Sequence, residues 1–202
     1  MHLASDEKRV NPVRSNTEIT VRPFVQADTD LFYRAVRESI ESLSYWFPWC
    51  NTQYSIGDAR DWIEFCVASW ERKSEFPLGI FSNTTGEVVG GTGLNHVSRA
   101  YNFANVGYWV AENHRSKGYA TAAAKFAIEI GFQEFEFTRL EIFILTNNKQ
   151  SARIAEKVGG VFEGIARNRL HFRGVPKDAL CYSLVPTLVD SNAEGYNLTR
   201  EF

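Results

Sequence analysis

The chain has 202 residues, 44% of them apolar, and a formal net charge of −2 at neutral pH. This length and apolar fraction fit one domain with a full core, and the near-neutral charge argues against a nucleic-acid-binding footprint. No run of about 18 apolar residues occurs, so neither a membrane span nor a membrane partner is expected.

Residues 1–16 are predicted to form a flexible arm, 17–187 one domain and 188–202 a tail. The arm is polar and lacks the apolar centre of a secretory signal. The three cysteines, at positions 50, 66 and 181, are odd in number and irregularly spaced. They predict neither a disulfide framework nor a metal site, and they favour a reducing, cytoplasmic compartment.

The first half of the domain should form a strand, two helices and a three-stranded meander. Alternation over 18–23 predicts a strand, and an apolar stripe that begins at Asp28 predicts a helix ending before 45–49. A second helix should begin within 55–58. Strands are expected over 76–81, 87–95 and 104–110. Gly90, Gly91 and Gly93 interrupt the middle strand and predict a bulge or a close backbone approach.

The second half should begin with a β-α-β crossover. A helix is expected over 119–135, and the apolar run 140–145 is typical of a strand buried on both faces, which favours parallel pairing. A shorter helix over 148–158 and strands over 161–166 and 179–184 should follow, with a loop at 167–177. The element order is therefore β-α-α-β-β-β-α-β-α-β-β, a mixed sheet of the α/β (α+β) class in one domain.

The turn 113–118 carries the clearest binding signal. It is a polar run between a buried strand and a long helix, and Gly118 is its only glycine. A helix that begins on such a turn directs unpaired N–H groups and a positive dipole end at one point, which suits a phosphate. Arg115 and Lys117 add positive charge. The spacing matches neither G-x-x-x-x-G-K-[ST] nor G-x-G-x-x-G, so a nucleotide-binding domain is disfavoured.

Arg115-Ser116-Lys117-Gly118-Tyr119-Ala120 resembles the Arg/Gln-x-x-Gly-x-Gly/Ala signature of the GNAT acetyltransferase superfamily. The flanking residues 107–110 and 120–121 make the chain similar to the RimJ/RimL-like branch, whose founding members acetylate the N-termini of ribosomal proteins. The element order is also that of the GNAT fold. The resemblance implies that the strands ending at Val110 and starting at Leu140 splay apart to hold the pantetheine arm of acetyl-CoA.

The resemblance also implies the residues that bind the cofactor. Backbone groups of Trp109, Val110 and Ala111 would contact pantetheine, and one N–H would polarise the thioester carbonyl. Asn148 and Ser151 match an Asn-x-x-Ser pattern at the start of the next helix. Asn148 would cap the helix and contact pantetheine, while Ser151 would protonate the departing thiolate, directly or through water.

The sequence does not identify a single general base for the reaction. Many relatives carry a glutamate where this chain has Asn105, and an amide cannot act as a base. The candidates are His96, His171, Glu112 or a chain of waters. Glu163 lies where some relatives place another glutamate. Tyr182 is a further acid candidate that is equally suited to the core.

Acceptor-binding residues are expected in two places. The aromatic stretch 45–49, with Trp46 and Trp49, would either wall the acceptor pocket or plug the edge of the sheet. Asn95 and Asn105 are the expected polar contacts. The acceptor would be a protein N-terminal α-amine, or a small-molecule amine such as an antibiotic or a polyamine. A non-catalytic acyl-CoA sensor stays open, as do a monomer and a homodimer.

Overall fold

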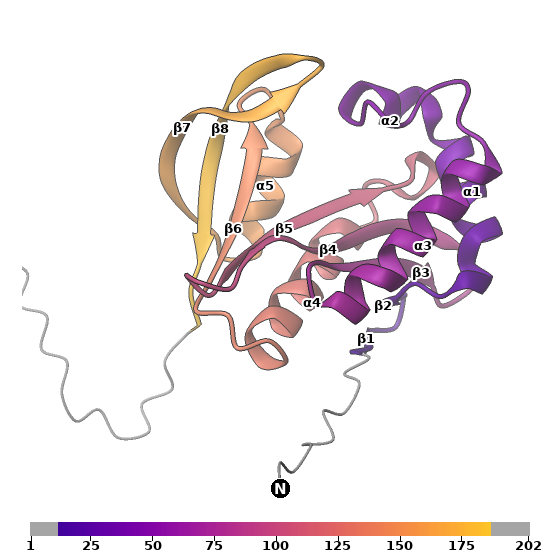
Figure 1. Ribbon diagram of the computed structural model, residues 1–202, viewed down its shortest axis with the longest axis horizontal. Coiled ribbons are helices and arrows are strands. Elements are labelled where there is room, and N and C mark those ends of the chain that lie inside the picture. Colours follow the sequence, from indigo (N-terminus) through magenta and orange to yellow (C-terminus); the bar gives the residue numbers. More distant parts are fainter. Residues whose placement is uncertain (1–11, 187–202) are drawn as a thin grey trace, which may run out of the picture.

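The polar and apolar alternation of the chain produces one mixed sheet with helices on both faces (Figure 1). The computed structural model describes residues 12–186, so the tail expected at 188–202 and most of the expected arm lie outside the described residues. The eight strands follow the order β1-β2-β3-β4-β5-β6-β8-β7. Neighbouring strands are antiparallel except β5 and β6, which are parallel, as predicted. The expected burial of β6 on both faces is wrong, because its residues alternate between buried and half-buried.

The strands are β1 (Arg14–Ser15), β2 (Ile19–Pro23), β3 (Phe76–Ser82), β4 (Val88–Ser98), β5 (Phe103–Val110), β6 (Arg139–Leu145), β7 (Val161–Phe172) and β8 (Val175–Leu184). The helices are α1 (Thr29–Glu38), α2 (Ile40–Trp46), α3 (Ile56–Arg72), α4 (Tyr119–Gln133) and α5 (Lys149–Lys157), with short 3₁₀ turns at Gln26–Asp28 and Glu112–His114. None of the described helices is both long and apolar enough to cross a membrane.

Three expectations about the elements are corrected. Arg14 and Ser15 pair with β2, so the sheet begins inside the expected arm, because an edge strand needs little apolar pattern. The first helix is two helices, α1 and α2, broken at Ser39, whose buried hydroxyl accepts a hydrogen bond from Glu112 N at 3.0 Å. The loop expected at 167–177 instead continues β7 and β8 to a tight turn at Arg173 and Gly174, both with positive φ.

Local signals explain the other helix starts. Ser55 caps α3 in a capping box, with Asp58 N donating to Ser55 Oγ and Ser55 N donating to Asp58 Oδ2. Gly118, with φ of 83°, is the N-cap of α4. Asn148 caps α5 through a 3.1 Å bond from Ser151 N to its side-chain oxygen. The expected helix boundaries at these three positions follow from that side-chain and backbone chemistry.

Two hydrophobic clusters cover the two faces of the sheet. Helices α4 and α5 pack on one face around residues such as Val106, Ala127 and Leu140. On the other face, α1 and α3 pack around residues such as Phe32 and Ile63. The strand residues of the second cluster belong to β3, β4 and β5, so this cluster does not extend to β6, β8 and β7.

The glycines of β4 allow the close backbone approach that the sequence predicted. A Cβ atom at Gly90 would lie 2.3 Å from the carbonyl oxygen of Trp109, and one at Gly91 would lie 2.6 Å from Trp109 Nε1. A side chain at Gly90 would therefore displace the backbone of β5, and one at Gly91 would displace the indole ring of Trp109. The glycines serve the packing of β5 and its tryptophan, and they set where the end of β5 lies.

Candidate active site

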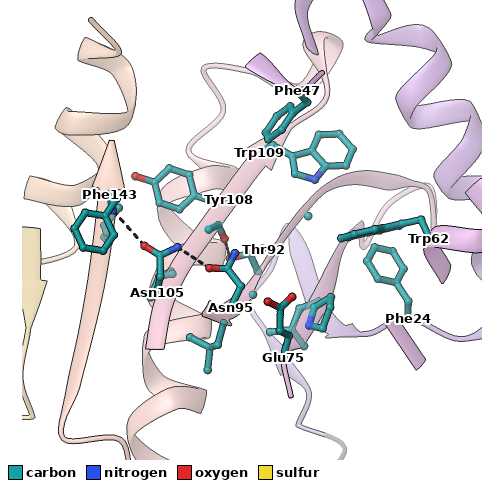
Figure 2. Close-up of a pocket in the computed structure, with 18 of the residues that line it drawn as sticks. Phe24, Phe47, Trp62, Glu75, Thr92, Asn95, Asn105, Tyr108, Trp109 and Phe143 are labelled. Carbon is teal, nitrogen blue, oxygen red and sulfur yellow. Dashed lines mark hydrogen bonds between the residues drawn. The ribbon is translucent and has the colours of Figure 1, made fainter. Parts of the chain in front are cut away.

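The site is built around the divergence of the two parallel strands. Residues Phe103, Ala104 and Asn105 of β5 pair with the first three residues of β6, and the pairing ends there. Beyond it, Asn105 holds the strands together with its side chain. Its Oδ1 accepts from Phe143 N at 3.2 Å, and its Nδ2 donates to Asn95 Oδ1 at 2.7 Å (Figure 2). The cleft thus opens as the resemblance implied, and Asn105 spans its apex.

Replacing Asn105 with alanine should lower the free energy of unfolding by about 1–3 kcal/mol. The change leaves the half-buried Phe143 N–H and Asn95 Oδ1 without these partners, which is the costly way to lose a hydrogen bond. Urea unfolding measures the effect. Asn147→Ala is the control, because Asn147 is exposed and its bond to Tyr45 Oη is a weak 3.5 Å, so it should change stability by less than about 0.5 kcal/mol. Equal effects of the two substitutions would contradict this structural role.

The backbone of β5 presents alternate N–H groups to the cleft. Ala111 N donates to Val89 O of β4 at 2.9 Å, so it is unavailable to a cofactor. In an antiparallel pair the bonding direction alternates, so Trp109 N also faces β4, while Tyr108 N and Val110 N face the side that β6 has left. Of the three expected backbone positions, only Val110 therefore offers its N–H to the cleft, and Tyr108 joins it.

The turn before α4 has the features of a diphosphate site. Ser116 and Gly118 both have positive φ, and no side chain caps the helix. The N–H groups of the first helical turn, from Tyr119 and Ala120 onward, have no helical partner because the first such bond is Ala122 N to Gly118 O. Arg115 and Lys117 are exposed beside them. This donor set and charge fit the diphosphate of acetyl-CoA.

Ser151 forms a hydroxyl pair with Tyr108, a residue that the sequence analysis did not single out. Ser151 Oγ donates to Tyr108 Oη at 3.0 Å, and Tyr108 Oη donates to the backbone oxygen of Ser151 at 3.0 Å. Burial raises the pKa of Tyr108 to about 12, partly offset by the hydrogen bond from Ser151. The phenol is therefore protonated near neutral pH, as a proton donor must be.

Tyr182 is placed elsewhere. Its hydroxyl donates to Glu156 Oε1 at 3.3 Å, its ring contacts Phe162, and it belongs to the core cluster under α5. The tyrosine at the cleft is Tyr108. The sequence could have indicated the position of Tyr108 only through the alternation of side chains along β5, which places Tyr108 on the face of the sheet that α5 covers.

A cavity of about 280 Å³ continues from the cleft towards α1 and α3 (Figure 2). Asn95, Asn105 and Trp49, the expected acceptor contacts, are among its lining residues. Trp46 does not, because its ring packs against Tyr45 and Phe172 of β7 instead. Phe47, from the same aromatic stretch, and Trp109 also line it. Aromatic side chains that the sequence did not single out complete the wall: Phe24, Phe32, Trp62 and Phe143.

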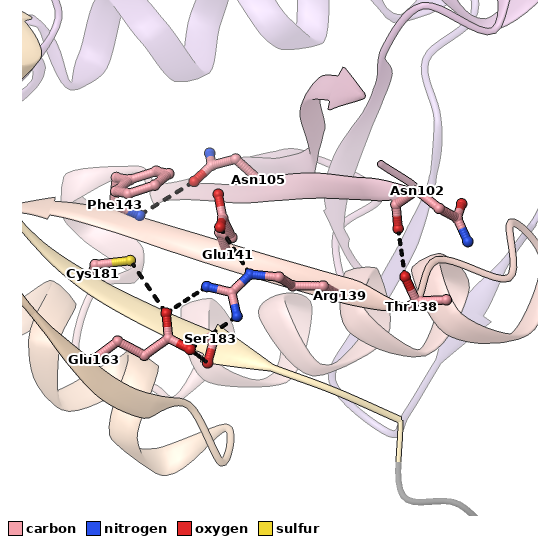
Figure 3. A network of polar contacts seen from close by, with 9 residues as sticks. All are labelled: Asn102, Asn105, Thr138, Arg139, Glu141, Phe143, Glu163, Cys181 and Ser183. Carbon is pink, nitrogen blue, oxygen red and sulfur yellow. Dashed lines mark hydrogen bonds and ion pairs between the residues drawn. The ribbon is translucent and has the colours of Figure 1, made fainter. Parts of the chain in front are cut away.

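The histidine and glutamate candidates for the base do not line this cavity. His96 is exposed on the irregular end of β4 with φ of 49°, and His171 and Glu112 are exposed as well. Glu163 is held in a network (Figure 3), where it accepts from Arg139 Nη1 at 2.9 Å and from Ser183 Oγ at 2.7 Å. The hydrogen bonds from Arg139, then Ser183, lower the pKa of Glu163 to about 2, so it is a poor proton acceptor.

Glu163 should contribute stability that disappears in acid. Its folded-state pKa is lowered from 4.5 to about 2, so the contribution is complete above pH 4.5 and is lost as the pH falls towards 2. Glu163→Gln should lower the melting temperature at neutral pH, and the melting temperature of this variant should fall less than that of the wild type between pH 4.5 and pH 2. Both effects should be modest, because the Arg139–Glu163 pair is exposed. Thermal unfolding across that range measures this. Glu64→Gln on α3 is the control, and an unchanged acid profile in Glu163→Gln would contradict the assignment.

Glu75 is a cavity-lining carboxylate that sequence reasoning missed. It lies in the short connection between α3 and β3, and its Oε1 accepts from His96 N at 3.4 Å. The sequence indicated this role only weakly, since a single acidic residue after a helix is common on protein surfaces. Within residues 12–186, no group of three or more His, Cys, Asp or Glu side chains is placed to hold a metal ion.

Comparisons with known proteins agree with this geometry. The family model for the acetyltransferase (GNAT) domain matches residues 18–161. "Putative ribosomal N-acetyltransferase YdaF" of Bacillus subtilis is 27% identical over 172 residues, which are 84% of this chain and 92% of that protein. Spermidine N(1)-acetyltransferase of Escherichia coli is 28% identical over 109 residues, which are 53% of this chain and 57% of that protein.

A solved structure supports the fold assignment. The structure of "a putative ribosomal-protein-serine acetyltransferase from Vibrio cholerae" aligns with a TM-score of 0.76 and 26% identity, covering 87% of this chain and 98% of that one. The predicted fold class is therefore confirmed, both in its element types and in its mixed sheet.

Proposed function

The chain belongs to the GNAT acetyltransferase family, and on that basis we propose that it acetylates the α-amine at a protein N-terminus. The protein is an acetyl-CoA-dependent N-acetyltransferase, as its family membership and its relatives indicate. The acceptor is the proposed part. It is supported by the ribosomal-protein acetyltransferases among the relatives.

The observation that carries the mechanism is the cleft between β5 and β6, which has binding groups on both walls. The α4 turn at 115–120 would hold the diphosphate, and the α5 cap residue Asn148 would lie along the pantetheine. Val110 N would then polarise the acetyl carbonyl and stabilise the oxyanion that develops on it. Holding both substrates in one cleft supplies much of the rate through proximity, with no covalent enzyme intermediate.

The Tyr108–Ser151 pair would protonate the leaving thiolate. The two hydroxyls are 3.0 Å apart, and both residues line the cavity that adjoins the cleft. Tyr108 is the stronger acid of the two, and Ser151 can orient it or pass the proton through it. Asn148 supports this arrangement because its side chain accepts from Ser151 N.

A small-molecule amine is the second candidate acceptor. The similarity to a spermidine acetyltransferase favours it, although that alignment covers 57% of the relative. The cavity argues the other way, because a polyamine carries several positive charges and Glu75 is the only carboxylate that the described part of the chain contributes to the lining.

Incubation with labelled acetyl-CoA, an N-terminal peptide library and an amine panel tests the proposal. We expect label on the α-amine of peptides, with release of free thiol in equal amount. Label on spermidine alone would select the second candidate. Acetyl-CoA binding without thiol release from any acceptor would identify a sensor and overturn the catalytic proposal.

A further inference from the structure

The charge of the cavity is concentrated in one residue. Its wall contains aromatic rings, the amides of Asn95 and Asn105 and the hydroxyls of Thr92, Tyr108 and Ser151. Among the lining residues within 12–186, Glu75 contributes the only carboxylate, and none is a lysine, arginine or histidine. A cavity of this kind favours a cation, because the ring faces and the carboxylate both attract positive charge.

The position of Glu75 is set by the connection that carries it. The next residues, Phe76 and Pro77, begin β3, and Trp70 Nε1 on α3 donates to Pro77 O at 2.7 Å. The Glu75 carboxylate accepts a single hydrogen bond within the described chain, from His96 N. Figure 2 shows it beside Asn95, on the opposite side of the two asparagines from Tyr108. The site therefore has a carboxylate at one end and a hydroxyl pair at the other.

We propose that Glu75 binds the ammonium group of the acceptor and takes one proton from it, the role that the amide of Asn105 cannot perform. The inference rests on the proposed function and names a catalytic residue for it. The substrate class that fits is an amine with one positive charge on an apolar or aromatic group. Its charge would face Glu75, and its apolar part would lie among Phe24, Phe32 and Trp62.

The proton balance of the step is complete. Glu75 accepts one proton from the ammonium, and the neutral nitrogen attacks the thioester carbon. The C–N bond forms and the C–S bond breaks, with the electron pair leaving on sulfur. The nitrogen loses its second proton to water, and the Tyr108–Ser151 pair delivers one proton to sulfur and takes one back from water, so the products are an amide and free CoA thiol. Glu75 then returns its proton to water.

The pH dependence of the rate distinguishes a base from a structural residue. At pH values between the pKa of a carboxylate and that of an amine, almost all of the carboxylate is ionised and almost all of the amine is protonated. The wild-type kcat/KM should therefore not change with pH in this range. The Glu75→Gln variant must bind amine that is already neutral, so its kcat/KM should rise about tenfold per pH unit. Two groups with titratable side chains interact with Glu75 directly. Cys66 of α3 has a pKa that burial raises, with a smaller contribution from Glu75, and His96 of β4 donates its backbone N–H.

The expected size of the effect depends on the amine. At neutral pH, Glu75→Gln should reduce kcat/KM about 100-fold for a strongly basic alkylamine such as 2-phenylethylamine. It should matter little for trifluoroethylamine, which is mostly neutral under those conditions. Acetyl-CoA affinity should not change. Glu71→Gln is the matched control, because Glu71 is exposed on the last turn of α3 and does not line the cavity.

A binding measurement keeps the test independent of turnover. With CoA present, 2-phenylethylamine should quench the fluorescence of the cavity tryptophans, and Glu75→Gln should weaken its binding at least tenfold. An active variant with the wild-type pH profile and wild-type amine binding would overturn the assignment of Glu75 and leave the proposed function standing. A wild-type protein that binds the ammonium through Glu75 but releases no thiol would instead overturn the proposed function and the proton-transfer half of this inference.

Discussion

Replacing Gly118 with glutamate is expected to weaken acetyl-CoA binding about 100-fold. The residue is the N-cap of α4, next to the unpaired N–H groups that would hold the diphosphate. A carboxylate there repels the phosphates, and Coulomb's law gives about 4 kcal/mol per charge pair at 4 Å near a surface before solvent screening reduces it. Isothermal titration calorimetry with acetyl-CoA measures the loss, which should diminish as salt is added.

Gly174 provides a matched control for this substitution. It has φ of 77°, close to the 83° of Gly118, and at both positions an added Cβ would meet nothing within 4 Å. Gly174→Glu therefore imposes the same left-handed strain and the same charge in the β7–β8 turn. Gly118→Asn tests strain separately, because asparagine tolerates this conformation. Equal acetyl-CoA affinity in Gly118→Glu and Gly174→Glu would contradict the diphosphate assignment.

Replacing Tyr108 with phenylalanine should lower kcat about 100- to 1,000-fold while leaving acetyl-CoA affinity nearly unchanged. The substitution removes the phenol that would protonate the thiolate but keeps the ring that packs in the cleft. Stopped-flow detection of free thiol gives kcat, and calorimetry gives the affinity.

Ser151→Ala and the double variant separate the two hydroxyls. If they act as one unit, the double variant should be little worse than Tyr108→Phe alone. Tyr182→Phe is the control, since its hydroxyl donates to Glu156 on α5 and Tyr182 does not line the cavity. A Tyr108→Phe variant with normal kcat would show that the proton comes from another donor.

Patterns that are local in the chain were readable from the sequence. The cap at Ser55, each element of the crossover from β5 to β6 and the glycines at 90 and 91 are visible as runs of adjacent residues, and the structure contains the features that they predict. The predicted divergence of β5 and β6 came from the family resemblance and not from periodicity. The break at Ser39 escaped prediction because its hydrogen bond comes from Glu112 N, 73 residues away in sequence.

The catalytic groups were harder to predict for the same physical reason. Tyr108 acquires its character from Ser151, 43 residues further along the chain, and from burial against α5. Ala111 fits the expected cofactor position by sequence, but backbone N–H groups along a strand alternate in direction, and that of Ala111 bonds to Val89 O. Glu75 has no motif of its own, and only the packing of α3 against β3 brings its carboxylate to the cavity.

The most direct test of the account is a crystal structure of the protein with acetyl-CoA. We expect the diphosphate on the N–H groups of the α4 turn at 115–120, pantetheine between β5 and β6, and the acetyl carbonyl oxygen within hydrogen-bonding distance of Val110 N. A cofactor bound outside the β5–β6 cleft, or a diphosphate with no contact to that turn, would contradict it.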